Sequence, residues 1–194
     1  MKHMKSIAIV FSIALLVSCN KQEEFNQATL EGLASLPENA IKEPYENNPD
    51  LIRVTIEAPT GNSQGDYLNG QRTGTWTEYS QTGIPKTITT YVNGLQQGAY
   101  FEIDDRGQLQ KVAYYGNGQL NGDWKQFNHT RIKEERHYVN GKIDGMVKVY
   151  YDNGKILEEG QYSNGLRNGI SKWYDQEGNV TIEYEYNNGE LVKK

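Results

Sequence analysis

A tetrapeptide, Tyr-x-Asn-Gly, recurs through most of the chain at a nearly constant interval. It begins at six tyrosines, spaced 24, 24, 23, 24 and 24 residues apart: Tyr67, Tyr91, Tyr115, Tyr138, Tyr162 and Tyr186. A fixed period of this length is typical of repeat proteins, in which each unit is a small structural element that packs on its neighbours. The chain from about residue 60 onward is therefore predicted to be a repeat array.

Each repeat unit has three further positions of constant character. A second glycine follows the Asn-Gly pair after three variable residues, at Gly74, Gly98, Gly122, Gly145 and Gly169. Five residues further lies a large apolar side chain, at Tyr79, Ile103, Phe127, Tyr150 and Tyr174. A turn glycine comes next, at Gly83, Gly107, Gly154 and Gly178. The third unit is one residue short because Asn128-His129-Thr130-Arg131 replaces this glycine turn, which explains the single interval of 23.

These positions predict two strands per unit. Asn-Gly is the strongest short-range signal for a two-residue hairpin, because both residues accept positive φ angles. The segments between turns are too short for helices, and their Tyr, Val, Ile and Thr content is typical of strands. We therefore expect an all-β fold, a single elongated antiparallel meander of about a dozen strands, roughly 55 Å long. The second glycine is expected at a bulge or at a close approach of two backbones.

The segment between the start of the chain and the repeats divides into two parts. Leu51 to Ala58 alternates apolar and polar residues, which predicts a strand that opens the array at residue 51. Residues 19–50 are rich in Glu, Asn and Gln and contain three prolines, which predicts a flexible tether. Within this tether, Ala28 to Leu36 could form one or two helical turns. The repeat domain is accordingly expected to cover residues 51–194.

Residues 1–18 have the pattern of a signal peptide, since Lys2 and Lys5 precede the apolar run from Ile7 to Val17. The run is too short for a membrane-spanning helix, which needs about 20 residues. Leu16-Val17-Ser18-Cys19 resembles the lipobox of bacterial lipoproteins, in which the cysteine thiol is diacylated and the chain is cut just before it. Cys19 is the one cysteine of the chain. The resemblance therefore implies lipidation at Cys19 and membrane attachment through several acyl chains.

The resemblance to lipoproteins also implies a cellular location. Asn20 follows the cysteine where inner-membrane lipoproteins carry an Asp, which favours the outer membrane of a bacterial cell envelope. Lys21-Gln22-Glu23-Glu24 resembles the acidic signal that sends some lipoproteins to the cell surface, although a solvated tether has the same composition. The periplasmic and surface orientations both stay open. With 20 basic and 25 acidic side chains, the chain lacks the basic stripe expected of a nucleic-acid-binding protein.

The repeat itself resembles a known family. The pattern Tyr-x-Asn-Gly-x-x-x-Gly-x-Trp-x-x-Tyr is complete from Tyr67 to Tyr79 and nearly complete from Tyr115 to Phe127. It is similar to the MORN repeat, in the variant found in YwqK-family antitoxin-like proteins, and the likeness covers about residues 65–194. Val147 and Ser171 depart from the pattern by replacing its tryptophan. Because MORN arrays serve many partners, the resemblance implies the fold and leaves the function open.

No group of residues predicts catalysis or metal binding. His129 and His137 are the only histidines after the predicted signal peptide, and neither has a second histidine or a cysteine at a ligand spacing. The acidic pairs Glu134-Glu135 and Glu158-Glu159 recur beside lysines and arginines, as expected of ion pairs on a solvated sheet. We expect a protein that is not an enzyme and that needs neither a cofactor nor a metal.

Aromatic residues are the strongest candidates for recognition. One column contains Trp76, Tyr100 and Trp124, and the other contains Tyr79, Phe127, Tyr150 and Tyr174. The columns are three residues apart, so a regular strand places them on opposite faces unless a bulge reorients one. Each column is either buried core, which we favour because a single sheet must bury something, or an exposed groove. The candidate binding surface consists of Trp76, Tyr100, Trp124, Tyr151 and Trp173.

Three functions follow from these observations. The leading hypothesis is a protein-binding or scaffold module held on the cell envelope by a lipid at Cys19, with a protein as its partner. The alternative, which the family resemblance implies, is an antitoxin or immunity protein that neutralises a toxin. A glycan-binding surface on the aromatic column is a third hypothesis. In each case recognition is expected in the strands, where the units differ from one another.

Overall fold

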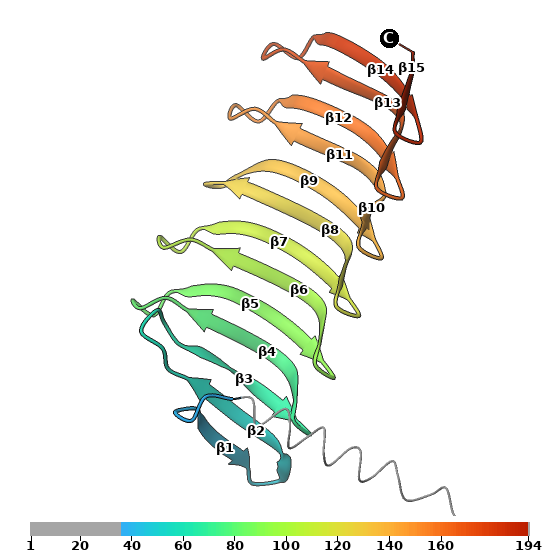
Figure 1. The fold of residues 1–194 in the computed structure, drawn as a ribbon. Helices are drawn as coiled ribbons and strands as arrows, with labels where there is room; N and C mark the ends of the chain where they lie inside the picture. The colour runs from blue at the N-terminus through green and yellow to red at the C-terminus, as the bar shows by residue number, and fades with distance from the viewer. Residues whose placement is uncertain (1–35, 194) are drawn as a thin grey trace, which may run out of the picture.

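The computed structural model describes residues 36–193, which form one sheet of fifteen strands (Figure 1). The predicted signal peptide, Cys19 and the tether up to residue 35 lie outside the described residues, as does the predicted helical turn apart from Leu36. Residues 36–193 contain no helix, and therefore none that is long and apolar enough to cross a membrane.

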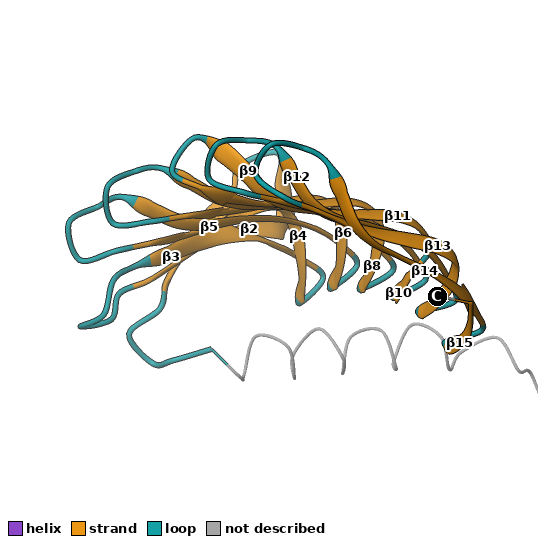
Figure 2. Cartoon of the chain, turned by 90° about the horizontal axis from the view of Figure 1, so that it is seen from above, coloured by secondary structure: helices purple, strands orange, loops and turns teal. Residues whose placement is uncertain are grey.

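The strands follow one another across the sheet in chain order, each antiparallel to the next, and the two-residue β10 pairs with β9 beside β11. Their bounds are β1 Ile41–Tyr45, β2 Asn48–Ile56, β3 Ser63–Leu68, β4 Gln71–Tyr79, β5 Pro85–Val92, β6 Leu95–Ile103, β7 Leu109–Gly116, β8 Gln119–Asn128, β9 Arg131–Val139, β10 Lys142–Ile143, β11 Gly145–Tyr150, β12 Ile156–Ser163, β13 Leu166–Tyr174, β14 Val180–Asn187 and β15 Glu190–Lys193. The predicted all-β meander is confirmed. Figure 2 shows that this open sheet is arched.

The Asn-Gly pairs form the hairpin turns between successive units. All six asparagines and their glycines have positive φ angles, for example 48° at Asn140 and 79° at Gly141, as a two-residue type I′ turn requires. The shortened third unit also uses a two-residue turn at the other end of its strands, because Asn128 pairs with Arg131 and His129 has a φ of 57°. The predicted turns are confirmed, and the missing residue shortens one turn without breaking the sheet.

The second glycine of each unit lies at an irregularity of the ladder. Gly74 has a φ of 63°, and the register of β3 against β4 changes around it. Asp66 pairs with Thr73, whereas Gln64 pairs with Thr77, so β4 carries extra residues here. All five of these glycines have positive φ angles, which confirms the predicted bulge.

The sheet begins earlier than the sequence predicted. β1 pairs with β2, so residues 41–50 belong to the sheet and not to a flexible tether. Pro44 lies in β1, at the edge of the sheet, where a strand needs hydrogen bonds on one side only and tolerates a residue without an N–H. Leu36 and Ala40 pack against the core cluster that contains Val54. A proline-bearing edge strand has the composition of a linker, which explains the incorrect boundary.

Cross-strand pairs define the two faces of the sheet. On one face, a row of paired residues combines large and small side chains, which alternate from β4 to β8. The row reads Trp76, Thr89, Tyr100, Ala113, Trp124 and Arg136 from β4 to β9 and Val147, Gly160, Ser171 and Tyr184 from β11 to β14. We call this side the aromatic face and the other the second face. The small residues leave room for the rings beside them, and the buried side chains of the strands lie on this face.

Neighbouring units are joined at their hairpins by a repeated hydrogen bond. The side-chain oxygen of the residue before the bulge glycine accepts a hydrogen bond from the backbone N–H of the asparagine in the following Asn-Gly turn. Asn121 Oδ1 accepts from Asn140 N at 3.2 Å, and Asn168 Oδ1 accepts from Asn188 N at 3.3 Å. Gln97 and Asp144 make the equivalent bonds. These bonds fix the distance from each hairpin to the next.

Candidate binding surface

The two predicted aromatic columns lie on opposite faces, as a regular strand requires. Four of the five predicted binding residues, Trp76, Tyr100, Trp124 and Trp173, come together on the aromatic face. The second column lies on the second face, where the hydroxyl of Tyr174 donates to Glu159 Oε1 at 2.6 Å. Tyr151 follows β11 and belongs to a turn, since its backbone N–H donates to the backbone oxygen of Lys155 at 2.8 Å. Its hydroxyl donates to the backbone oxygen of Tyr174 at 2.7 Å.

Trp76 is a core residue. Its side chain is only 3% exposed, and its ring meets that of Tyr67 edge-on with centroids 5.4 Å apart. The indole Nε1 donates to the backbone oxygen of Asp66 at 3.0 Å, which satisfies its one polar group. Trp76 therefore stabilises the first units and offers no open surface to a partner.

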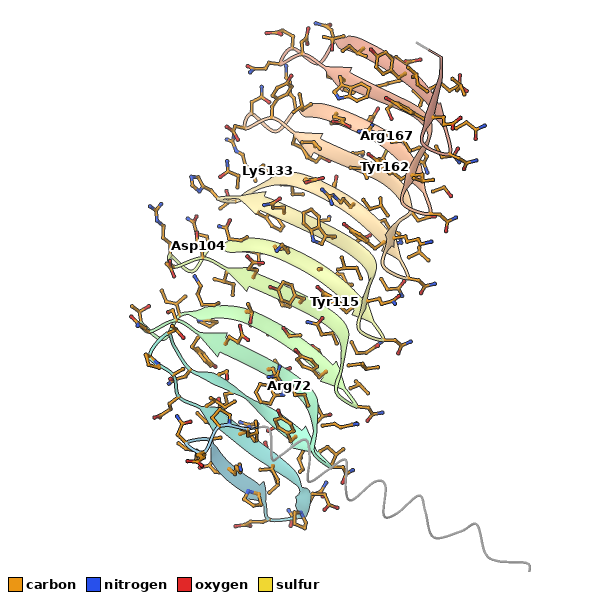
Figure 3. All side chains as sticks on the ribbon, viewed as in Figure 1. Arg72, Asp104, Tyr115, Lys133, Tyr162 and Arg167 are labelled. Carbon is orange, nitrogen blue, oxygen red and sulfur yellow. The ribbon has the colours of Figure 1, made fainter. Side chains whose placement is uncertain are left out.

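Arginines stack on several rings of the aromatic face, including that of Trp76. Arg136 lies 4.9 Å from the ring centroid of Trp124, and Arg72 lies 4.5 Å from that of Trp76. Arg167 contacts the rings of Trp173 and Tyr162 at 5.2 Å each. Figure 3 marks Arg72, Tyr115, Tyr162 and Arg167 along this face. Because each guanidinium is a cation placed over a π face, the rings already have partners within the chain.

The acidic residues of the aromatic face are also paired. Glu102 Oε2 accepts from Lys111 Nζ at 2.5 Å and from the hydroxyl of Tyr100 at 3.3 Å. The hydrogen bond from Lys111 lowers the pKa of Glu102, and burial raises the pKa of Tyr100 to about 12. Glu102 therefore stays ionised and hydrogen-bonded at neutral pH, a poor starting point for general acid catalysis.

The second face changes character between the two halves of the array. One row of paired residues reads Thr77, Ile88, Phe101 and Val112 across β4 to β7, and then Lys125, Glu135, Lys148, Glu159, Lys172 and Glu183 across β8 to β14. In the charged half, Lys125 Nζ lies 3.5 Å from Glu135 Oε2 and Lys172 Nζ lies 3.6 Å from Glu183 Oε2. The charged half is thus self-complementary, whereas the first half is uncharged.

An apolar patch fills the uncharged half of this row. Phe101 on β6 pairs with Ile88 on β5 and with Val112 on β7. Ile103 and Leu109, a pair at the ends of β6 and β7, extend the group along the same face. We call these five residues the apolar patch. All five are half-buried, and no second layer of the described residues covers them. Uncharged apolar area of this kind is typical of protein-binding surfaces.

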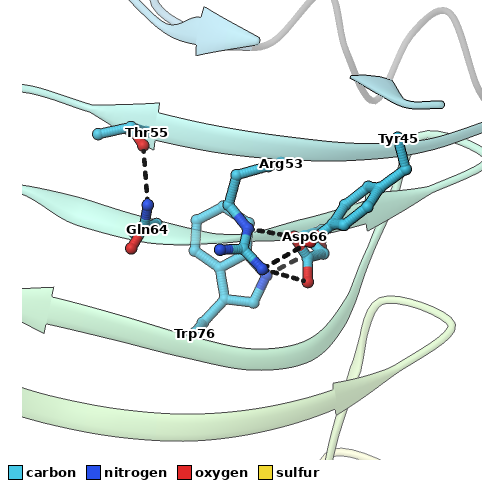
Figure 4. A network of polar contacts seen from close by, with 6 residues as sticks. All are labelled: Tyr45, Arg53, Thr55, Gln64, Asp66 and Trp76. Carbon is cyan, nitrogen blue, oxygen red and sulfur yellow. Dashed lines mark hydrogen bonds and ion pairs between the residues drawn. The ribbon is translucent and has the colours of Figure 1, made fainter. Parts of the chain in front are cut away.

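A polar network joins the first three strands of the sheet (Figure 4). Arg53 Nε donates to Asp66 Oδ1 at 2.5 Å, and Arg53 Nη2 donates to the hydroxyl of Tyr45 at 2.6 Å. The hydrogen bond to Asp66 is the main cause of the raised pKa of Arg53. This pairing ties β1 to β2 and β3, so it is a structural contact.

The histidines do not form a metal site. His137 Nδ1 lies 2.8 Å from Asp123 Oδ1 on the second face, and His129 lies in the two-residue turn of the third unit. Residues 36–193 contain no group of three or more acidic, histidine or cysteine side chains placed to hold a metal ion.

Two features of this surface were missed by the sequence analysis. The first is the row of amide and carboxylate side chains that cap the next hairpin, although its signal is present as Gln97, Asn121, Asp144 and Asn168 at one repeat position. The second is the row of paired residues on the second face that runs from Thr77 to Glu183, which we call the matched row. Aligning the units by their bulge glycine reveals this row. Its paired positions are both apolar at Ile88 and Phe101 and oppositely charged at the equivalent Glu159 and Lys172.

Comparison with known proteins supports the repeat assignment. Three segments, residues 72–93, 143–164 and 167–188, match the MORN repeat variant, so the array contains MORN-type repeats. No curated protein matches the chain. One similar solved structure is the glycosylation-associated Gap123 complex of Streptococcus agalactiae, with 17% identity over 59% of this chain and 19% of that chain and a TM-score of 0.31. Another is that of accessory secretory proteins 1, 2 and 3 of Streptococcus pneumoniae, with 16% identity over 63% of this chain and 24% of that chain and a TM-score of 0.32. A third is TarM of S. aureus, with 13% identity over 89% of this chain and 27% of that chain and a TM-score of 0.30. The chain spans about a fifth to a quarter of these proteins.

Proposed function

We propose that this chain is a lipid-anchored protein of the bacterial cell envelope whose MORN-type repeats form a non-enzymatic protein-binding module. One observation carries the proposal: the matched row of the second face is apolar at Ile88, Phe101 and Val112 and charge-paired in the later units. The same backbone supports both compositions. The apolar patch is therefore dispensable for the fold and is best explained by a partner that covers it.

The aromatic face is less suited to this role. Its rings are packed on small residues or stacked under arginines of the same chain, as Trp76 and Trp124 show. A glycan or protein that bound there would first have to displace those arginines. This contrast favours the apolar patch over the five aromatic residues predicted from the sequence.

The experiment exploits the pairing found in the later units. In the mature chain carrying Cys19→Ala, the double substitution Ile88→Glu and Phe101→Lys copies the Glu159–Lys172 pair and removes the centre of the apolar patch. Cross-linking in an envelope extract, followed by mass spectrometry, should recover one discrete protein with the unsubstituted chain and lose it with the double variant. Glu159→Gln is the control and should retain the partner.

The outcome separates the alternatives. Equal recovery by both chains would rule out the patch, and recovery of polysaccharide alone would refute protein binding. If the captured protein is a toxin domain, the same surface performs the antitoxin function that the family resemblance implied. Anchoring is tested independently: Cys19→Ala should move the full chain from the membrane to the soluble fraction, and persistence in membranes would refute lipidation.

A further inference from the structure

The C-terminal end of the sheet has an edge that is only half covered. Among the described residues, β15 alone lies outside β14, and it pairs only with Glu185, Tyr186 and Asn187. Within residues 36–193, the first half of β14, from Val180 to Glu183, pairs with a strand on its inner side only. Val180 and Ile182 there are 49% and 43% exposed. An exposed strand edge with β-branched residues is a template for another strand.

The backbone of this edge is oriented for pairing. Asn187 and Glu190 close the last hairpin, so the N–H and C=O of Asn187 point toward β15. Alternation along an antiparallel strand gives Glu185 and Glu183 the same outward direction. The preceding unit has the same arrangement, because Ser163 and Leu166 close its hairpin and Glu159, which occupies the repeat position of Glu183, pairs with Lys172 on the next strand.

The matched row of the second face indicates what should pair with Glu183. Val112, which pairs with Lys125, is the exception at the boundary between the apolar and the charged half. At the other positions the residue and its partner on the next strand agree in chemistry, since Ile88 pairs with Phe101 and Glu159 with Lys172. Glu135 likewise pairs with Lys148. Glu183 ends the series, and Lys172 neutralises it only from the inner side, at 3.6 Å. A basic residue would complete the alternation on the outer side.

The opposite end of the sheet is closed to this kind of contact. β1 is short, carries Lys42 and Glu43, and has Pro44 near its end. Charges and proline are the usual protection of an edge strand. Head-to-tail joining of two copies through β1 and β14 is disfavoured for this reason. The β14 strand of a second copy has no basic residue to place opposite Glu183, so a strand from another protein is the occupant that fits.

We infer that the outer edge of β14 accepts an extended strand of a partner protein, antiparallel to β14 and with a basic side chain opposite Glu183. The strand adds backbone hydrogen bonds at Thr181 and Glu183, and its basic residue pairs with the Glu183 carboxylate. This site is separate from the apolar patch, so either proposal can fail without the other.

The test uses a labelled peptide with the sequence of β13, residues 166–174, because β13 already places Lys172 opposite Glu159 at the equivalent edge. The mature chain carrying Cys19→Ala should bind this peptide in fluorescence anisotropy. Peptide Lys172→Glu should bind roughly threefold to tenfold more weakly, as expected for a like-charge pair across strands. Hydrogen exchange should slow at the Glu183 amide when the peptide is bound.

Two variants of the chain complete the experiment. Glu183→Lys should reverse the preference and favour the Lys172→Glu peptide, and Glu183→Pro should abolish binding because it removes the outward N–H. Circular dichroism confirms that each variant is folded. Absence of binding at millimolar peptide, or binding that ignores both charge changes, would overturn the proposal. Concentration-dependent self-association with protection at β14 would overturn it too, since the occupant would then be a second copy.

Discussion

The indole ring of Trp76 lies directly against the backbone of Gly65 on the neighbouring strand, where a methyl group would come within 2.2 Å of its Cδ2 atom. Gly65 is buried, so the ring has no room to move away. The glycine is needed here for space and not for a left-handed backbone. In the third unit Ala113 pairs with Trp124, and that ring is half-buried instead of buried.

Gly65→Ala is therefore expected to destabilise the first units by roughly 1–3 kcal/mol, the usual cost of overpacking a core. The midpoint of urea unfolding measures the loss. In the background of Trp76→Leu, which frees the space, the same substitution should cost less. Gly83→Ala is the control: it has a φ of 81° and nothing within 4 Å, so its cost is conformational and should not depend on Trp76.

The repeat period predicted the fold because local signals and long-range pairing agree in this chain. Each Asn-Gly turn fixes a hairpin, and the constant spacing forces every hairpin to stack on the last, so the meander followed without knowledge of any contact. The start of the sheet could not be predicted in this way. β1 lies outside the period, and its pairing with β2 depends on tertiary contacts such as that of Arg53 with Tyr45.

The binding surface was harder to predict than the fold for a physical reason. Sequence shows which side chains are large, but burial depends on the neighbour across the strand. Trp76 is covered because Gly65 lies beside it, and Trp173 is partnered because Arg167 reaches it from the start of the same strand. The apolar patch was missed because Ile88 and Phe101 each fit an ordinary strand, and only their pairing makes them a surface.

Ser171 replaces the tryptophan of the repeat in the fifth unit, and Arg167 should be essential there. Its guanidinium contacts the rings of Tyr162 and Trp173, donates to Ser171 Oγ at 2.9 Å and pairs with Glu158. Arg167→Met keeps the stem but removes these contacts, which should destabilise the C-terminal units by roughly 1–3 kcal/mol. Thermal unfolding followed by tryptophan fluorescence measures this loss. Arg106→Met, in an exposed turn, should leave the transition unchanged, and equal transitions in both variants would contradict the assignment.

The capping bonds between hairpins predict a local effect. Asn168→Ala removes the acceptor for Asn188 N, a bond of 3.3 Å, and should cost roughly 0.5–1.5 kcal/mol. Hydrogen exchange at the Asn188 amide should accelerate while amides in the first units stay protected, because each unit contacts only its neighbours. Gln176→Ala, in the exposed turn before β14, should leave the Asn188 amide unaffected. Unchanged exchange in Asn168→Ala would show that the bond does not hold the hairpin.

The pair of Tyr174 and Glu159 makes the stability of the second face depend on pH. The carboxylate of Glu159 accepts a hydrogen bond from the phenol hydroxyl at 2.6 Å, and this hydrogen bond raises the pKa of Tyr174 from 10.0 to about 12. The unfolded chain loses this proton near the ordinary pKa, whereas the folded chain keeps it to higher pH. The contribution is fully present below pH 10 and is lost as pH rises from 10 to about 12.

Removing either partner should flatten this part of the pH profile. Glu159→Gln takes away the negative charge, so the pKa of Tyr174 should fall toward its ordinary value in an NMR titration of ring-labelled tyrosine. Tyr174→Phe should unfold with a smaller change in urea midpoint between pH 9 and pH 11 than the unsubstituted chain shows. Tyr79→Phe serves as the control, because Gln64, which pairs with Thr77, occupies the position of Glu159 on the preceding strand and carries no negative charge. If Glu159→Gln leaves the titration of Tyr174 where it was, the hydrogen bond is not the cause of the shift.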